Sequence, residues 1–498
     1  MNRTSATRGI AIFAAIKLLF HVLTNNAYGF HRDELQTLDD ARHLAWGYVA
    51  YPPFTAFIGR IELTLFGTSL TGFRFFAAVA QCVVIVLAAL LARRLGGGRA
   101  AQWIAAAAVA ISPVSLSASA LFQYVSFDIL WWVVVAFTLA ILIDTDDPRW
   151  WLPLGAAIGL GVETKYTMAF LIAGVVVAVL LTPLRRHLKS KWLWAGVALS
   201  LLIAAPNLIW QYQHDYISLD FLKHIHERDV AIGRTDDFLK EQFYIASNLV
   251  TVPLWIAGLI ALFVSARLRK FRALAILVIT PFILFLIAKG RGYYATPLYV
   301  PLIAAGAVQL TAVANEWRPS LRRVAAVITV LLLIAGSLVA AIVLPIAPEG
   351  SAMWKRALEE NDDFKEQYGW PELTTEVARI YNTLPSSERA QTGIFASNYG
   401  EAGAINLYGP ALNIPRAMSG INSFWYRGYD RPEPKNLIVL GADRTDMEML
   451  CTSVEVAGHL TNRQGIENEE TTRHRDVYLC RGMKVTLEQI WPEARSFG

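Results

Sequence analysis

Residues 29–67 read GFHRDELQTLDDARHLAWGYVAYPPFTAFIGRIELTLFG, a segment rich in charge that lies between two long apolar stretches, 10–28 and 73–91. A bilayer core about 30 Å thick is crossed by about 20 apolar residues in a helix. Both flanking stretches meet that length. The quoted segment is therefore predicted to be a loop at one membrane surface, the outer loop 29–72, in a protein built of spans and such loops.

The same measure predicts eleven membrane-spanning helices. They are expected at 10–28, 73–91, 101–120, 126–143, 150–163, 167–183, 192–211, 248–265, 273–288, 294–314 and 324–345. Of the 498 residues, 55% are hydrophobic and 17% are charged, and the mean hydropathy is +0.39. Soluble domains carry about 25% charged residues, so a cytosolic enzyme, a coiled coil, a disordered chain and a nucleic-acid binder are all poor fits.

Charge divides the chain into two regions. Residues 346–498 hold 22 acidic and 16 basic residues, whereas residues 1–345 hold 18 acidic and 29 basic ones. We therefore expect a transmembrane domain, 1–345, followed by a soluble domain, 346–498. Alternate loops of the first region carry nearly all of its surplus arginine and lysine, and such loops stay in the cytoplasm. The N-terminus is predicted to be cytoplasmic, the first span to remain uncleaved, and the soluble domain to be extracytoplasmic.

Two stretches of the outer loop have the apolar spacing of short helices. The first, from Leu35 to Ala45, carries Asp39 and Asp40 on its opposite face, and the second runs from Phe54 to Leu65. Such stripes suit helices that lie in the membrane interface, or loop helices that pack on the bundle. Pro52-Pro53 prevents one helix from running through both stretches.

Four ionisable residues, His31-Arg32-Asp33-Glu34, stand at the outer end of the first span. Such side chains at a membrane surface cost desolvation energy unless they are paired or hydrated. They suit either an anchor with internal ion pairing or a carboxylate that takes a proton from a hydroxyl at this depth.

The chain resembles the C-type (GT-C) integral-membrane glycosyltransferases, in particular a bacterial group similar to protein O-mannosyltransferases and lipid A aminoarabinose transferases (glycosyltransferase families 39 and 83). The likeness covers most of residues 9–345. It is carried by Asp33-Glu34, by Ala45 to Pro53 (AWGYVAYPP), by Phe127-Asp128 at the start of an apolar helix, by Gly161 to Tyr166 (GVETKY) and by Tyr293 to Pro301 (YYATPLYVP).

The resemblance implies an integral protein of a bacterial inner or plasma membrane, in contact with membrane lipids. It implies an inverting transfer of a sugar, on the extracytoplasmic side, from a polyprenyl-phosphate donor to a hydroxyl of a glycan, lipid or protein. Asp33 would be the general base, Glu34 would position Asp33 or bind a sugar hydroxyl, and Asp128 would bind the sugar. There is one departure. The aminoarabinose transferases place a lysine just before the Pro-Pro pair, where this chain has Ala50-Tyr51, so the donor phosphate needs another cation or the donor sugar differs.

A leaving phosphate gathers negative charge, which fixed cations stabilise. The candidate substrate-binding residues on the outer side are His31, Arg32, Lys165, Arg291 and Tyr293. Lys165 lies in a short turn and could instead pair with the neighbouring glutamate. Glycines flank Arg291 and allow the backbone to approach a phosphate, and the following tyrosine can donate a hydrogen bond.

The outer loop 212–247 holds His224 and His226 among several carboxylates. Their spacing matches no established metal signature, and a solvated loop over the active site fits better. Since cations can stabilise the leaving group, a divalent metal is possible but not required, and no other cofactor is expected. A transporter or flippase for a lipid-linked sugar is the alternative function. It predicts internal repeats with matching helix breaks, which the sequence lacks.

The soluble domain has the alternation of a small α/β fold. Strands are expected at 436–441, 454–459 and 477–480, with a helix at 445–453 between the first two. The aromatic run 418–428 (MSGINSFWYRG) predicts a surface either for sugar stacking or for packing against the membrane side. Cys451 and Cys480 could form a disulfide in an exported domain or remain two buried thiols.

Overall fold

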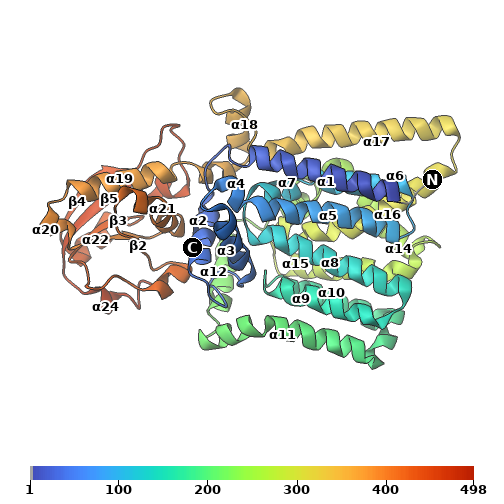
Figure 1. The fold of residues 1–498 in the computed structure, drawn as a ribbon, viewed down its shortest axis with the longest axis horizontal. Coiled ribbons are helices and arrows are strands. Elements are labelled where there is room, and N and C mark those ends of the chain that lie inside the picture. The colour runs from blue at the N-terminus through green and yellow to red at the C-terminus, as the bar shows by residue number, and fades with distance from the viewer. Residues whose placement is uncertain (1–3) are drawn as a thin grey trace.

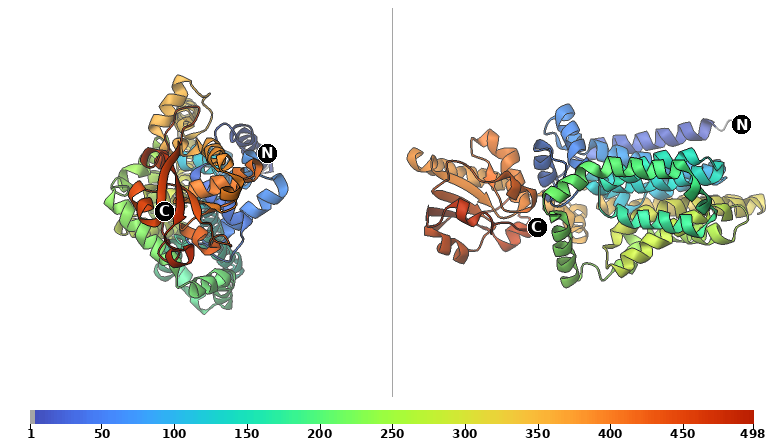
Figure 2. Two further views of the ribbon diagram at one scale, coloured as in Figure 1. Left: turned by 90° about the vertical axis from the view of Figure 1, so that its left-hand side faces the viewer. Right: turned by 90° about the horizontal axis from the view of Figure 1, so that it is seen from below.

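The computed structural model describes residues 4–498. A bundle of helices with roughly parallel axes forms one part, and a domain with a β-sheet lies at one end of it (Figures 1 and 2). The N-terminus lies at the opposite end of the bundle from that domain. The two parts therefore meet along a single border, where the outer loop lies.

The bundle helices follow the apolar stretches of the sequence. They are α1 (Thr4–Thr24), α5 (Phe75–Arg94), α6 (Arg99–Ala110), α7 (Pro113–Ala120), α8 (Tyr124–Thr145), α9 (Trp151–Val162), α10 (Met168–Leu181), α11 (Lys191–Gln213), α14 (Val252–Val264), α15 (Arg272–Ile287), α16 (Thr296–Asn315) and α17 (Pro319–Ala340).

In the described part of the chain, seven helices are long and apolar enough to cross a membrane alone, and the number reaches ten if each of three bent pairs is one span. One such pair is α6 and α7, bent by 62°. The bend follows from Pro113, because the residue before a proline is driven into extended backbone, as Ser112 is. The helix α9, with 12 residues, is too short to count, so the total of eleven spans remains a prediction.

Short helices lie at the end of the bundle that faces the sheet domain. They are α2 (Arg32–Arg42), α3 (Phe54–Phe66), α4 (Leu70–Phe73), α12 (Ile217–Ala231) and α13 (Phe238–Tyr244). Of these, α2, α3, α4 and α12 are labelled there in Figure 1. Leu35 and Leu38 of α2 are buried, as their spacing predicts. Asp39 and Asp40, on the opposite face of α2, are also buried, and both pair with Arg427 of the sheet domain.

The expected α/β domain is present. Its helices are α18 (Ala352–Glu360), α19 (Trp370–Thr383), α20 (Ser386–Arg389), α21 (Tyr399–Tyr408), α22 (Arg444–Leu450), α23 (Glu469–Arg473) and α24 (Leu487–Ile490), and its strands are β1 (Thr392–Ala396), β2 (Ala417–Met418), β3 (Asn436–Leu440), β4 (Cys451–His459) and β5 (Asp476–Met483). The strand order is β2-β1-β3-β5-β4. β1 runs parallel to both neighbours, and β5 runs antiparallel to both of its own.

Two details of this domain answer open expectations. Cys451 and Cys480 form a disulfide, which links the adjacent strands β4 and β5. The helix expected at 445–453 ends at Leu450 because β4 begins at Cys451. In the aromatic run, Phe424 is buried in the hydrophobic core between the bundle and the sheet domain. Tyr426 contacts His214 at the end of α11, with ring centroids 5.1 Å apart. The run therefore packs against the membrane side.

One hydrophobic core spans the border between the two parts. Leu35 and Leu38 of α2 share it with Trp370 and Ile405 of the sheet domain. At Gly403 of α21, an added Cβ would lie 2.8 Å from the backbone of Leu35. Such close packing holds the sheet domain in one position on α2, and thereby over the residues that α2 carries.

Candidate active site

A cavity of about 500 Å³ lies at the border between the bundle and the sheet domain. A cavity of this size suits a small-molecule substrate. Its wall is built from α2, from the loops after α7, α9 and α15, from α12 and from the sheet domain. The charged residues, the histidine and the tyrosines that line it are Arg32, Asp33, Tyr51, Tyr124, Lys165, Tyr166, His226, Arg228, Asp229, Arg234, Lys289, Arg291, Tyr294 and Tyr399.

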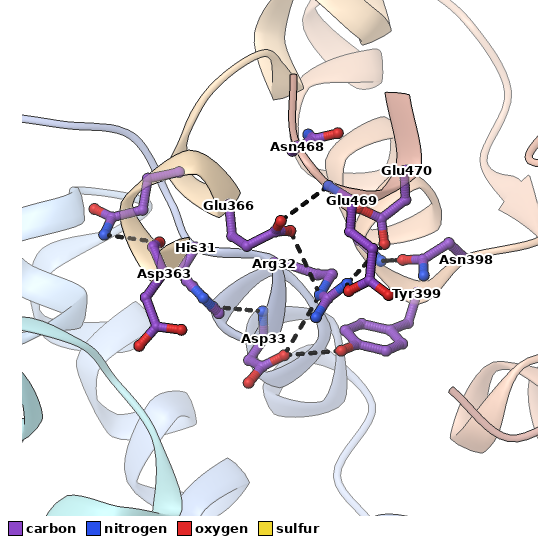
Figure 3. A network of polar contacts seen from close by, with 12 residues as sticks. His31, Arg32, Asp33, Asp363, Glu366, Asn398, Tyr399, Asn468, Glu469 and Glu470 are labelled. Atoms are coloured by element: carbon purple, nitrogen blue, oxygen red, sulfur yellow. Dashed lines mark hydrogen bonds and ion pairs between the residues drawn. The ribbon is translucent and has the colours of Figure 1, made fainter. Parts of the chain in front are cut away.

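Asp33 faces this cavity, and its side chain is 42% exposed. Its Oδ1 accepts a hydrogen bond of 2.9 Å from the Tyr399 hydroxyl (Figure 3), and its Oδ2 accepts one of 2.9 Å from Gln123. Burial raises the pKa of Asp33, but the charges of His31 and Arg32 and the Tyr399 bond outweigh it and hold the pKa below its usual value. Asp33 is therefore a charged carboxylate at neutral pH.

Glu34, the next residue, points the other way and is fully buried. Its two oxygens accept bonds of 2.6 and 2.7 Å from Arg74 and bonds of 2.8 Å from the backbone N–H of His31 and of Phe122. No oxygen is left for a sugar hydroxyl, so that expected role is not supported. Glu34 instead fixes the start of α2, which carries Asp33.

His31 and Arg32 also differ from the predicted substrate contacts. His31 does not line the cavity, because its Nδ1 caps α2 by accepting the backbone N–H of Asp33 at 3.1 Å. Arg32 lines the cavity, but its guanidinium is held by Glu469 and Glu470 of the sheet domain at 2.7 and 3.0 Å (Figure 3). His31 therefore does not reach the cavity, and the charge of Arg32 is balanced by carboxylates of the sheet domain.

Lys165 and Asp128 meet at a second point of the cavity. The Lys165 Nζ lies 4.0 Å from Asp128 Oδ2, so its partner is not the neighbouring glutamate. Its ammonium also lies 4.0 Å from the ring centre of Tyr294 and 5.1 Å from that of Tyr293, close enough for cation–π attraction. Lys165 and Tyr294 line the cavity, whereas Asp128 and Tyr293 do not.

A cluster of three arginines surrounds Asp229. Its carboxylate lies 2.6 Å from Arg291, 3.4 Å from Arg228 and 3.8 Å from Arg234, and all four residues line the cavity. One buried carboxylate cannot neutralise three guanidiniums, so this part of the wall carries surplus positive charge. The cluster holds one predicted residue, Arg291, and two that were missed.

The missed residues had different signals in the sequence. Arg228 and Arg234 belong to the loop 212–247, which was expected to cover the active site, and their charge alone could have marked them. Tyr399 and Gln123 had no such signal, since one lies 366 residues from Asp33 and the other 90. Within residues 4–498, no group of three or more His, Cys, Asp or Glu side chains is arranged to hold a metal ion.

The fold is similar to that of solved integral-membrane glycosyltransferases. The structure of ArnT from Cupriavidus metallidurans bound to undecaprenyl phosphate superposes with a TM-score of 0.60, at 16% sequence identity, over 95% of this chain and 98% of that one. Residues 50–210 match the family model described as dolichyl-phosphate-mannose-protein mannosyltransferase. The resemblance to the aminoarabinose transferase and O-mannosyltransferase group is thus confirmed.

Two curated relatives fall in the same group. Lipid A galacturonosyltransferase RgtD of Rhizobium johnstonii is 25% identical over 254 residues, which cover 49% of this chain and 53% of the relative. Undecaprenyl phosphate-alpha-4-amino-4-deoxy-L-arabinose arabinosyl transferase 1 of Pseudomonas fluorescens is 29% identical over 261 residues, which cover 49% of this chain and 46% of the relative. Each match therefore spans about half the length of the relative.

Proposed function

We propose that this protein is a membrane glycosyltransferase that moves a sugar from a polyprenyl-phosphate donor to an acceptor hydroxyl outside the cytoplasmic membrane. The observation that carries the proposal is a charged carboxylate, Asp33, facing the same cavity as a cluster of arginines. The names of the relatives support an undecaprenyl-phosphate donor and a lipid A acceptor. The basic loops support a cytoplasmic N-terminus.

In the proposed reaction Asp33 acts as general base. It takes the proton from the acceptor hydroxyl while that oxygen attacks the anomeric carbon, and the bond from that carbon to the phosphate oxygen breaks with its electron pair going to the phosphate. A single displacement of this kind inverts the anomeric centre. General base catalysis contributes roughly 10²–10⁴-fold to the rate.

The leaving phosphate is assigned to the arginine cluster. Guanidinium groups bind phosphate oxygens in pairs, and Arg228, Arg234 and Arg291 offer several such groups beside one carboxylate. Tyr51, which stands just before the Pro-Pro pair where the aminoarabinose transferases have a lysine, is neutral and bonds to Asp40. The arginine cluster supplies the positive charge that this lysine would have given. These cations make a metal ion unnecessary for stabilising the leaving group.

Lys165 is assigned to the donor sugar, and Asp128, which does not line the cavity, is assigned to positioning the Lys165 ammonium. The Lys165 ammonium has aromatic rings around it and a carboxylate only at 4.0 Å, so its donors remain available to sugar oxygens on the cavity side. A sugar carboxylate would be bound more strongly there than a hydroxyl, since hydrogen bonds between charged groups are about twice as strong as neutral ones. Galacturonosyl and aminoarabinosyl donors are therefore the first pair to compare.

The test is an in vitro transfer assay with full-length protein in nanodiscs. Labelled polyprenyl-phosphate donors carrying galacturonic acid or 4-amino-4-deoxyarabinose are supplied with lipid A. Asp33→Asn is expected to lower the rate by at least about 100-fold, whereas the exposed Asp363→Asn serves as a matched control and keeps it. Undiminished transfer by Asp33→Asn would remove the base. Translocation of the donor across vesicles, without transfer from any donor, would favour a flippase.

A further inference from the structure

Tyr399 is one of the residues of the sheet domain that line the cavity. It is the first residue of α21, and its hydroxyl donates to Oδ1 of Asp33 at 2.9 Å (Figure 3). Gln123, just before α8, donates to Oδ2 at the same distance. The two oxygens of the carboxylate are therefore held from two sides, one by the bundle and one by the sheet domain.

The position of Tyr399 is fixed by helix packing. An added Cβ at Gly400 would lie 2.8 Å from the Cγ of Arg32, and one at Gly403 would lie 2.8 Å from the backbone of Leu35. Real Cβ atoms do not approach other atoms so closely, so the two glycines allow α21 and α2 to touch. The Tyr399 hydroxyl reaches Asp33 because of this contact.

Arg32 forms a second link at the same place. Its guanidinium bonds to Glu469 and Glu470 and lies 3.7 Å from Glu366, three carboxylates of the sheet domain. It also lies 5.5 Å from the ring centre of Tyr399. The residue directly before Asp33 is therefore tied to the sheet domain, and its side chain covers the ring of Tyr399.

We propose that Tyr399 is a positioning residue for the transfer reaction, which orients the Asp33 carboxylate toward the acceptor hydroxyl, so that the sheet domain completes the active site. The inference rests on the proposed role of Asp33 as general base. A carboxylate held by one donor on each oxygen keeps one orientation, and its remaining lone pairs face the cavity where the acceptor arrives.

Removing the hydroxyl has two opposing effects on the rate. A hydrogen bond to the charged form lowers the pKa of a carboxyl group, so Tyr399→Phe makes Asp33 a stronger base. The same change frees the carboxylate to rotate, and a misplacement of about 1 Å costs on the order of 100-fold in rate. The loss of orientation is therefore expected to outweigh the gain in basicity, with a net decrease in kcat of about tenfold.

The experiment compares full-length Tyr399→Phe with wild type in nanodiscs, using galacturonosyl and aminoarabinosyl polyprenyl-phosphate donors and lipid A. The expected result is a kcat about tenfold lower, a donor KM within about twofold, because the arginine cluster is untouched, and an acidic limb of kcat shifted upward by about one pH unit. Tyr408→Phe, at the far end of α21, is the matched control and is expected to behave as wild type.

If Tyr399→Phe has the kcat and pH profile of wild type, the positioning role is overturned. If Asp33→Asn is inactive in the same assay, the proposed function still stands. Active Asp33→Asn would overturn the proposed function itself. If Tyr399→Phe folds poorly, 3,5-difluorotyrosine at position 399 provides a second test. It keeps the shape of the side chain and makes its hydroxyl a stronger hydrogen-bond donor to Asp33. It should shift the acidic limb to lower pH, and an unmoved limb would contradict the proposal.

Discussion

Arg74 and Glu34 form a fully buried ion pair, and its disruption gives the sharpest test of the structure around Asp33. Arg74→Met leaves the Glu34 carboxylate buried with only two of its four hydrogen bonds, those from the backbone of His31 and Phe122. Removing one partner of such a pair costs about 3–5 kcal/mol. Arg74 also donates to the carbonyls of Asn25 and Gly29, which places the expected loss at the upper end of that range.

The assay is reversible unfolding in mixed micelles with a denaturing detergent, followed by tryptophan fluorescence. Arg60→Met is the control, because Arg60 lies on the nearby helix α3 of the outer loop and is exposed, and exposed substitutions usually change stability by less than about 0.5 kcal/mol. Adding Glu34→Gln to Arg74→Met removes the unpaired charge and should restore roughly 2–3 kcal/mol, a coupling typical of contacting residues.

A loss below about 1 kcal/mol for Arg74→Met, or no recovery in the double variant, would refute this reasoning. The result also separates two roles for Glu34. If Glu34 only anchors α2, Glu34→Gln alone lowers stability and transfer together. If Glu34 contacts the sugar, the second of the two roles that the family resemblance implies, the same variant loses transfer while its unfolding curve stays in place.

Three further predictions concern other parts of the molecule. Arg291→Met should weaken binding of undecaprenyl phosphate by about 10–100-fold in a titration of the purified protein, since a charge-assisted hydrogen bond contributes about 1.5–3 kcal/mol. An unchanged affinity would contradict the assignment of the phosphate to the arginine cluster. Burial and then the charge of Glu470 raise the pKa of Glu401 to about 8, so the folded state keeps a proton that the unfolded state loses near pH 4.3, and stability falls as the pH rises between these values. The variant Glu401→Gln can still cap α21, so its melting temperature should exceed that of wild type at pH 9 and equal it at pH 4. A difference in melting temperature that does not change with pH would contradict this. Cys451→Ser opens a loop with a sequence separation of 29 and should destabilise the sheet domain by about 3–4 kcal/mol, measured by its melting temperature, with reductant lowering that of wild type alone.

The sequence predicted the parts of this protein whose signal is local. Apolar stretches of about 20 residues place helices wherever they occur, and the alternation of strand and helix signals in residues 346–498 reports the sheet domain. The same patterns placed Asp33, Lys165 and Arg291 at the ends of spans on one side, and these three residues do line one cavity.

The sequence did not predict the hydrogen-bond and ion-pair partners of polar side chains. Glu34 stands beside Asp33 in the sequence, yet the two side chains point in opposite directions, and the arginine that decides this lies 40 residues further on. Asp39 and Asp40 lie on the side of α2 opposite Leu35 and Leu38, and the sequence gives no signal for their partner. Arg427, from the other part of the molecule, pairs with both and buries them.

The sequence by itself indicated which segments form long apolar helices, that an α/β domain follows them, and which charged residues lie near the ends of those helices, because hydrophobic length and residue periodicity act within one segment. Only the tertiary structure decided which of those charges are free, which are neutralised, and that Tyr399 reaches Asp33. Such pairings depend on how helices far apart in the chain pack against one another, and no local pattern of residues records that packing.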